Sequence, residues 1–163
     1  MFYKLSDLSK AKRSVAISLL SLIGITVAFI FIQSMLSRET SGAESGAVRE
    51  FLERFFSYDS PFGAFILNNL RKIAHFAEYG VLGAEISLFV SLFAKDAMKL
   101  IPYTPLVGHG VAFIDETIQI FSGRGPAILD VWIDTLGFIT LSFAVYLVFF
   151  LRDLISKKET ENG

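Results

Sequence analysis

The feature that most constrains this chain is an uncharged, apolar stretch at residues 15–36. A helix needs about 20 apolar residues to cross the hydrocarbon core of a bilayer, and this stretch supplies them. A cleaved signal peptide would also follow a positively charged segment, but its apolar part is only about 7–15 residues long. We therefore predict a retained transmembrane helix over residues 15–36, preceded by an N-terminal segment over residues 1–14.

The composition of the whole chain agrees with a membrane protein. Hydrophobic residues make up 53% of the 163 residues and charged residues only 19%, which is unusual for a soluble domain. The chain has no Cys and only two His, which excludes disulfides and thiolate metal sites and argues against a His-rich zinc site. Its net charge of −1 gives no basic field for nucleic acid, so we expect no nucleic-acid partner.

Later stretches of the chain repeat the apolar pattern. We predict an all-α, polytopic membrane protein with about four transmembrane helices plus a short amphipathic interfacial helix. The predicted spans are residues 15–36, 73–94, 105–121 and 128–151. One membrane domain therefore covers residues 15–151, with an outer loop and interfacial helix over residues 37–70 and a tail over residues 152–163.

The interfacial helix is predicted from a short amphipathic pattern. Its apolar residues follow helical spacing and its charged residues occupy the other face. The apolar set is Val48, Phe51, Leu52, Phe55 and Phe56. After it, Ser60-Pro61 has the pattern of an N-cap followed by a first helical residue, and Thr104-Pro105 repeats that pattern.

The positive charges predict the orientation of the spans. The two termini and the turn at residues 95–99 carry nine Lys and Arg, all in short segments, whereas the other side carries six, mainly in a longer loop. Cytoplasmic loops are richer in Lys and Arg, so we predict that both termini are cytoplasmic.

This orientation places three sets of polar residues in the outer half of the bilayer. The first set opens the second span, the second set lies near the end of the third span, and the last two acids open the fourth. In chain order they are Arg71, Lys72, His75, Glu78, Tyr79, Asp115, Glu116, Gln119, Arg124, Asp130 and Asp134. Ionisable groups inside a membrane are costly to bury, so we predict that these residues form one site. Gly80 and Gly83 predict a close approach of another helix to the second span.

The same residues resemble the signatures of the VanZ-like membrane proteins. The first signature is similar to Lys72-x-x-His75-Phe76-x-x-Tyr79 with Gly80 and Gly83, and the second is similar to Asp115-Glu116-x-x-Gln119, Gly123-Arg124, Asp130 and Asp134-x-x-Gly137. The resemblance implies a small multi-pass protein of the bacterial cell membrane. It also implies a link to resistance against the lipoglycopeptide teicoplanin.

The leading hypothesis for the polar set is an outer-leaflet pocket that binds an envelope lipid or another envelope amphiphile. Its donors would be Arg71, Lys72 and Arg124, which can bind phosphate or carboxylate groups. The ligand-binding residues would be the eleven polar residues named above.

Three alternatives to this hypothesis stay open. In the first, the cluster is the active site of an enzyme that acts on a lipid-linked phosphate or acyl group, with His75, Glu78, Asp115 and Glu116 as catalytic candidates. In the second, the cluster is a purely structural charge network. A small carrier would need polar residues deeper in the membrane, where Glu85 and His109 lie, although the simplest account of these two is that they pair with each other.

For cofactors, we expect none. A divalent cation on the oxygens of Asp115, Glu116, Asp130 and Asp134 is the alternative, since carboxylates suit Mg²⁺ or Ca²⁺. The expected partner is a membrane lipid or envelope amphiphile. A homo-oligomer is compatible with the sequence, which does not fix a number of subunits.

Overall fold

The computed structural model describes residues 3–36, 46–94, 97–122 and 128–161, and it confirms the predicted all-α class. A short 3₁₀ helix η1 (Leu5–Asp7) precedes the long helix α1 (Lys10–Met35). After a helical segment at residues 46–52 come α3 (Pro61–Asn68) and α4 (Leu70–Phe93). A second 3₁₀ helix, η2 (Ala97–Tyr103), leads into α5 (Thr104–Phe121), and α6 (Ile128–Glu161) ends the fold.

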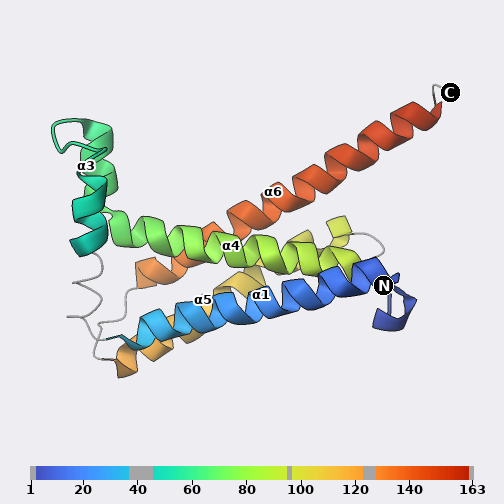
Figure 1. The fold of residues 1–163 in the computed structure, drawn as a ribbon, viewed down its shortest axis with the longest axis horizontal. Coiled ribbons are helices and arrows are strands. Elements are labelled where there is room, and N and C mark those ends of the chain that lie inside the picture. The colour runs from blue at the N-terminus through green and yellow to red at the C-terminus, as the bar shows by residue number, and fades with distance from the viewer. Residues whose placement is uncertain (1–2, 37–45, 95–96, 123–127, 162–163) are drawn as a thin grey trace.

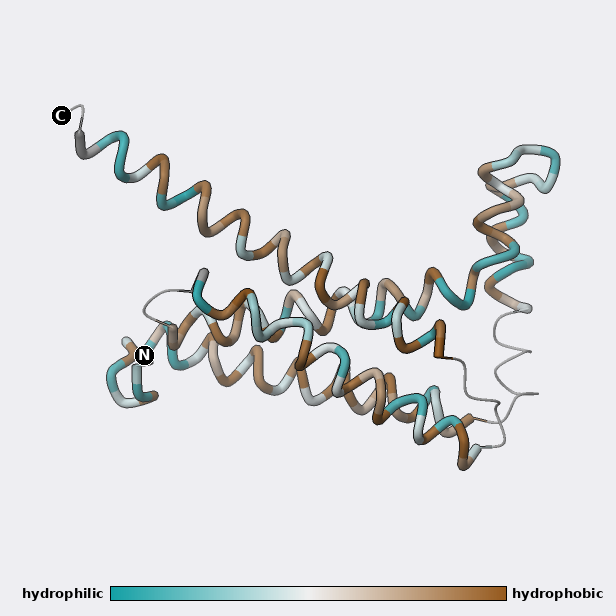
Figure 2. Tube along the Cα trace, turned by 180° about the vertical axis from the view of Figure 1, so that it is seen from behind, coloured by the Kyte–Doolittle hydropathy of each residue, from teal (hydrophilic) through white to brown (hydrophobic). Residues whose placement is uncertain are grey.

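Three of these helices, α1, α4 and α6, are long and apolar enough to cross a membrane. Large hydrophobic side chains such as Leu20, Phe29, Val148 and Leu151 are exposed on α1 and α6, and Figure 2 shows how hydrophobic residues recur along these helices. Lipid tails would cover such surfaces. With 18 residues, α5 spans about 27 Å, close to the thickness of the hydrocarbon core. Because α5 carries several polar residues, its role as a membrane-spanning helix stays a prediction.

Of the two helix N-caps predicted from the sequence, the structure confirms the one at Ser60 and contradicts the one at Thr104. Ser60 caps α3, since its Oγ accepts a hydrogen bond of 2.9 Å from the backbone N–H of Gly63. The predicted cap at Thr104 is wrong, because α5 already includes Thr104 and its N-cap is Tyr103. The preceding η2 explains the difference, since the Thr104 hydroxyl donates back to the carbonyl of Leu100 in that element.

The main helix contacts form a closed ring in the order α1, α4, α6 and α5 (Figure 1). The closest approach joins α4 to α6. A Cβ atom built on Gly83 would lie 2.2 Å from the carbonyl oxygen of Phe138, and one built on Gly137 would lie 2.2 Å from that of Phe76. Only glycine permits two helix backbones to come this close. The predicted close approach at Gly83 is therefore confirmed.

At one end of the ring, the segment 46–52 and α3 stand across the axis of α4 (Figure 1). The helix of the first segment ends at residue 52, so Phe55 and Phe56 lie beyond it, and the predicted amphipathic helix is shorter than the apolar spacing indicated. Large aromatic side chains on this unit are exposed, Phe55 by 69% and Phe62 by 66%. An orientation across the spanning helices suits a unit that lies in the membrane interface.

The opposite end of the ring carries both termini (Figure 1). There α6 continues as a helix to Glu161, well past the predicted end of the span at residue 151. Its last turns extend away from the other helices, so the tail predicted at residues 152–163 is helical in the part that the structure describes.

Candidate functional site

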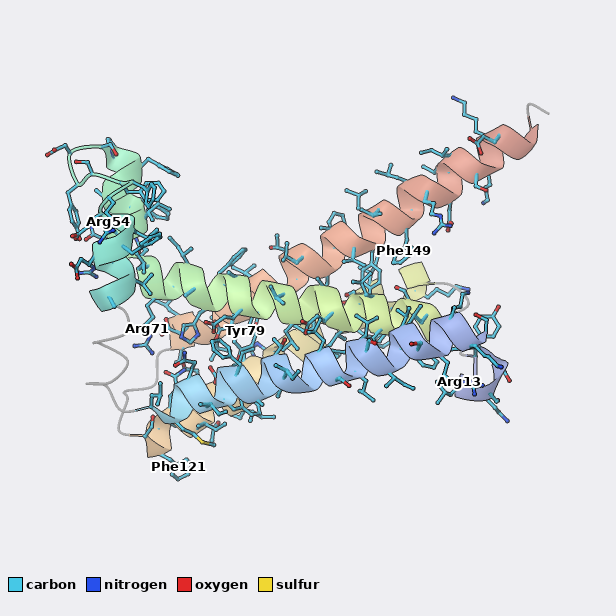
Figure 3. The ribbon with its side chains drawn as sticks, in the orientation of Figure 1. Arg13, Arg54, Arg71, Tyr79, Phe121 and Phe149 are labelled. Carbon is cyan, nitrogen blue, oxygen red and sulfur yellow. The ribbon has the colours of Figure 1, made fainter. Side chains whose placement is uncertain are left out.

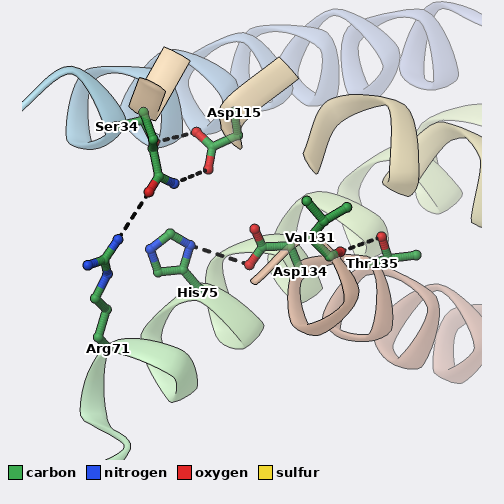
Figure 4. A network of polar contacts seen from close by, with 8 residues as sticks. Ser34, Arg71, His75, Asp115, Val131, Asp134 and Thr135 are labelled. Carbon is green, nitrogen blue, oxygen red and sulfur yellow. Dashed lines mark hydrogen bonds and ion pairs between the residues drawn. The ribbon is translucent and has the colours of Figure 1, made fainter. Parts of the chain in front are cut away.

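Polar side chains from all four helices of the ring meet inside it. Ser34 comes from α1, His75 from α4, Asp115 from α5 and Asp134 from α6 (Figure 4). Ser34, Asp115 and Asp134 are at most 1% exposed. The predicted convergence of α4, α5 and α6 is present, and α1 adds a residue that was not predicted.

Asp115 is the centre of a chain of hydrogen bonds. Its carboxylate accepts from the hydroxyl of Ser34 and, at 3.2 Å, from the amide nitrogen of Gln119 one helical turn later. The amide oxygen of Gln119 accepts a hydrogen bond of 3.1 Å from the guanidinium of Arg71. The exposed Arg71 is thereby connected through a buried amide to a buried carboxylate.

A second contact joins α4 to α6. Nδ1 of His75 lies 3.3 Å from Oδ1 of Asp134, and the His75 side chain is 15% exposed. The glycine contacts explain this pairing, because Gly137 follows Asp134 by three residues and packs on the backbone of Phe76, next to His75. His75, Asp115 and Asp134 each place one nitrogen or oxygen atom within 4.8 Å of those of the other two.

The remaining predicted residues are distributed around this centre. Tyr79 is fully buried in the ring core, and it projects from α4 on the same side as Arg71 (Figure 3). Glu116 is buried, Glu78 and Asp130 are half-buried, and Lys72 is exposed. Arg124 lies outside the described residues, as does Gly123. Direct contacts thus join Arg71 through Gln119 to Asp115, and His75 to Asp134. The two groups lie side by side, because ligand atoms of His75, Asp115 and Asp134 are within 4.8 Å of one another.

The simple account that Glu85 pairs with His109 is wrong. Glu85 is buried against α1 and accepts a hydrogen bond of 3.0 Å from the hydroxyl of Thr26. His109 is exposed, lies 3.3 Å from the hydroxyl of Thr135 and packs its ring near Trp132. The two side chains face different neighbours because Glu85 on α4 points toward α1, whereas His109 on α5 points toward α6.

Sequence reasoning missed Ser34 and Ser122. Ser34 binds Asp115, and the hydroxyl of Ser122 donates to the backbone carbonyl of Ser34 at 2.8 Å, linking the ends of α1 and α5. A signal was present, because Ser34 lies at the end of the first span at the depth predicted for Asp115. A lone serine in a helix is usually satisfied by its own backbone, which hides such a role.

The sequence of the chain also matches a known family. The VanZ/LLP1 family model matches residues 18–151. The chain belongs to the VanZ/LLP1 family. No curated protein and no solved structure matches it.

In this VanZ/LLP1 protein, His75, Asp115, Gln119 and Asp134 of the signature-like residues lie in the polar cluster. Gly80, Gly83 and Gly137 lie at the contacts between α4 and α6. Two hollows among the described residues lie elsewhere. One, of about 330 Å³, is lined by Tyr3, Phe89, Val90 and Phe93. The other, of about 490 Å³, lies along the last turns of α6 around Arg152.

The chemistry open to the cluster follows from its groups. Arg71 and Gln119 are donors for an anion or a polar headgroup. A histidine beside a carboxylate is the pairing that acid–base catalysis uses. A nitrogen and two carboxylates at close range are also a donor set for a metal ion.

Proposed function

We propose that this VanZ/LLP1 protein is a cell-envelope membrane protein whose polar cluster binds the headgroup of an envelope lipid or of a lipoglycopeptide. The observation that carries the proposal is the hydrogen-bonded path from exposed Arg71 through Gln119 to buried Asp115. A guanidinium held in place by a neighbouring amide is a prepared donor for phosphate or carboxylate groups.

The neighbouring elements support an amphiphile rather than a soluble ligand. Arg71 lies in the first turn of α4, directly after α3, whose Phe62 and Phe65 are exposed. A headgroup at Arg71 would therefore have apolar surface beside it for an acyl chain. By resemblance to the VanZ-like proteins, we extend the proposal to tolerance of teicoplanin, which carries such a chain.

We expect the Arg71→Ala variant to lose bound ligand. Removing one charge-assisted hydrogen bond of about 1.5–3 kcal/mol would weaken binding at least about tenfold. Lipid that co-purifies with the protein, measured by mass spectrometry, should fall accordingly. Teicoplanin tolerance of a susceptible host expressing the variant should fall to the level of the empty vector.

The matched control for this experiment is Arg152→Ala, which removes an exposed arginine from the far part of α6. It should retain both bound lipid and tolerance at equal amounts of membrane protein. Equal lipid content and equal tolerance in Arg71→Ala and the unaltered protein would contradict the proposal.

We also propose that both termini are cytoplasmic and that the cluster faces the outer leaflet. The termini lie at the end of the ring opposite Arg71 (Figures 1 and 3), which supports opposite sides for the two ends. The excess of Lys and Arg near the termini supports the cytoplasm for that end.

Single cysteines will test this topology, because the natural chain has none. A membrane-impermeant maleimide added to intact cells should label Asp59→Cys and leave Lys158→Cys unlabelled until the cells are opened. Both residues are exposed, so burial does not limit either reaction. Labelling of Lys158→Cys in intact cells would mean that the topology is the reverse of the one proposed.

A further inference from the structure

We propose that His75, Asp115 and Asp134 form a binding site for one divalent transition-metal ion. The set differs from the acids considered from the sequence, because it includes a histidine and omits Glu116 and Asp130. The proposal is independent of the proposed function, since it concerns the ion alone.

The geometry of the three groups is close to that of a metal site. Nδ1 of His75 and Oδ1 of Asp134 are 3.3 Å apart, and the three ligand atoms lie within 4.8 Å of one another. Ligands at about 2.0–2.2 Å from a tetrahedral ion are about 3.4 Å apart. One edge of the site already has this length, and the other two are at most 4.8 Å long.

An unsatisfied polar atom in the same place points to a ligand. Asp134 is fully buried, its Oδ1 faces Nδ1 of His75 at 3.3 Å, and its Oδ2 has no hydrogen-bond partner among the described residues. Buried polar groups are nearly always paired, because an unmet one costs about 1–3 kcal/mol. An ion bound to Asp134 would satisfy its carboxylate.

The charges of the site favour a divalent cation. Asp115 and Asp134 bring two carboxylates into a ring of membrane helices, where unpaired charges are costly. A protonated His75 would balance only one of them. A divalent ion would balance both and leave His75 neutral, the form that ligates metals.

Charged residues around the three ligands also favour a cation. Two further acids lie one helical turn from the ligands, Glu78 after His75 on α4 and Asp130 before Asp134 on α6. Arg71 opposes a cation, but its guanidinium donates to Gln119 at the edge of the cluster. The local acids therefore outnumber the nearby arginine.

The neighbours of Asp115 resemble the supports of known metal ligands. Ser34 and Gln119 both donate to its carboxylate, one to each oxygen. Such outer hydrogen bonds fix the direction of a ligating carboxylate. The His75 side chain is 15% exposed, and a metal site needs such access from outside.

The mixed nitrogen and oxygen donors select the class of ion. Imidazole suits Zn²⁺ and Fe²⁺ and carboxylates suit Mn²⁺, whereas Mg²⁺ and Ca²⁺ prefer oxygen ligands alone. The test is a titration of the full-length protein in detergent, purified without a polyhistidine tag and stripped with a chelator. Zn²⁺ and Mn²⁺ would be added separately, and bound metal measured by mass spectrometry after gel filtration.

We expect one ion per chain, and binding more than about 100-fold weaker in His75→Ala and in Asp134→Asn. The matched control is His109→Ala, which removes the other histidine and should bind as tightly as the unaltered protein. His75→Gln, a second variant with little change in size, keeps the test valid if His75→Ala does not fold. Absence of stoichiometric binding by the unaltered protein, or equal binding by folded His75→Gln, would overturn the proposal.

Discussion

Replacing Gly83 or Gly137 with leucine is expected to separate α4 from α6 and to remove most folded protein from the membrane. At both positions a Cβ atom would lie 2.2 Å from a backbone carbonyl oxygen of the facing helix. Backbone cannot rotate away as a side chain can, so even alanine would force the helices apart. Overpacking typically costs about 1–3 kcal/mol per site, and a leucine here would exceed that range.

The measurement is thermal unfolding in detergent, followed by fluorescence-detected gel filtration, for alanine and leucine at each site. Gly24→Ala and Gly110→Ala are matched controls, because a Cβ atom at either position meets nothing within 4 Å. The alanine variants at Gly83 and Gly137 should melt several degrees below these controls. Melting temperatures equal to those of the controls would mean that α4 and α6 do not pack this closely.

Much of this fold follows from the sequence because membrane helices leave simple patterns. The uncharged stretch at residues 15–36 predicted α1, which the structure places at Lys10–Met35. The third and fourth predicted spans, at residues 105–121 and 128–151, begin within one residue of α5 and α6. Apolar length and charge position determine these elements locally, without reference to their neighbours.

The partners of individual side chains were harder to predict from the sequence, because pairing depends on how the helices are arranged around the ring. Depth alone placed His75, Asp115 and Asp134 at one level of the bundle, and the structure brings them together. Depth also suggested that Glu85 pairs with His109, and there it failed, since Thr26 and Thr135 lie closer. Ser34 was missed for the same reason, because nothing in the sequence assigns α1 a place beside α5.

The other large effect is expected at Asp115, the residue on which the hydrogen bonds of α1, α4 and α5 depend. The Asp115→Ala variant removes the acceptor for both Ser34 and Gln119. Each buried donor left without an acceptor costs about 1–3 kcal/mol, and no water is available in the membrane to replace it. Folded protein should therefore fall strongly, and Arg71 should lose the rigid amide that positions it.

Graded variants separate the loss of hydrogen bonds from the loss of charge. Asp115→Asn keeps one oxygen acceptor and should be less destabilising than Asp115→Ala. The control Asp153→Ala, at an exposed position on α6, should unfold as the unaltered protein does. Combining Asp115→Asn with Ser34→Ala should give a coupling energy of about 0.5–3 kcal/mol, as for other pairs in contact. Strictly additive effects would mean that α1 is not connected to the cluster through Ser34. The site would then be built by residues of α4, α5 and α6 alone, as the sequence predicts.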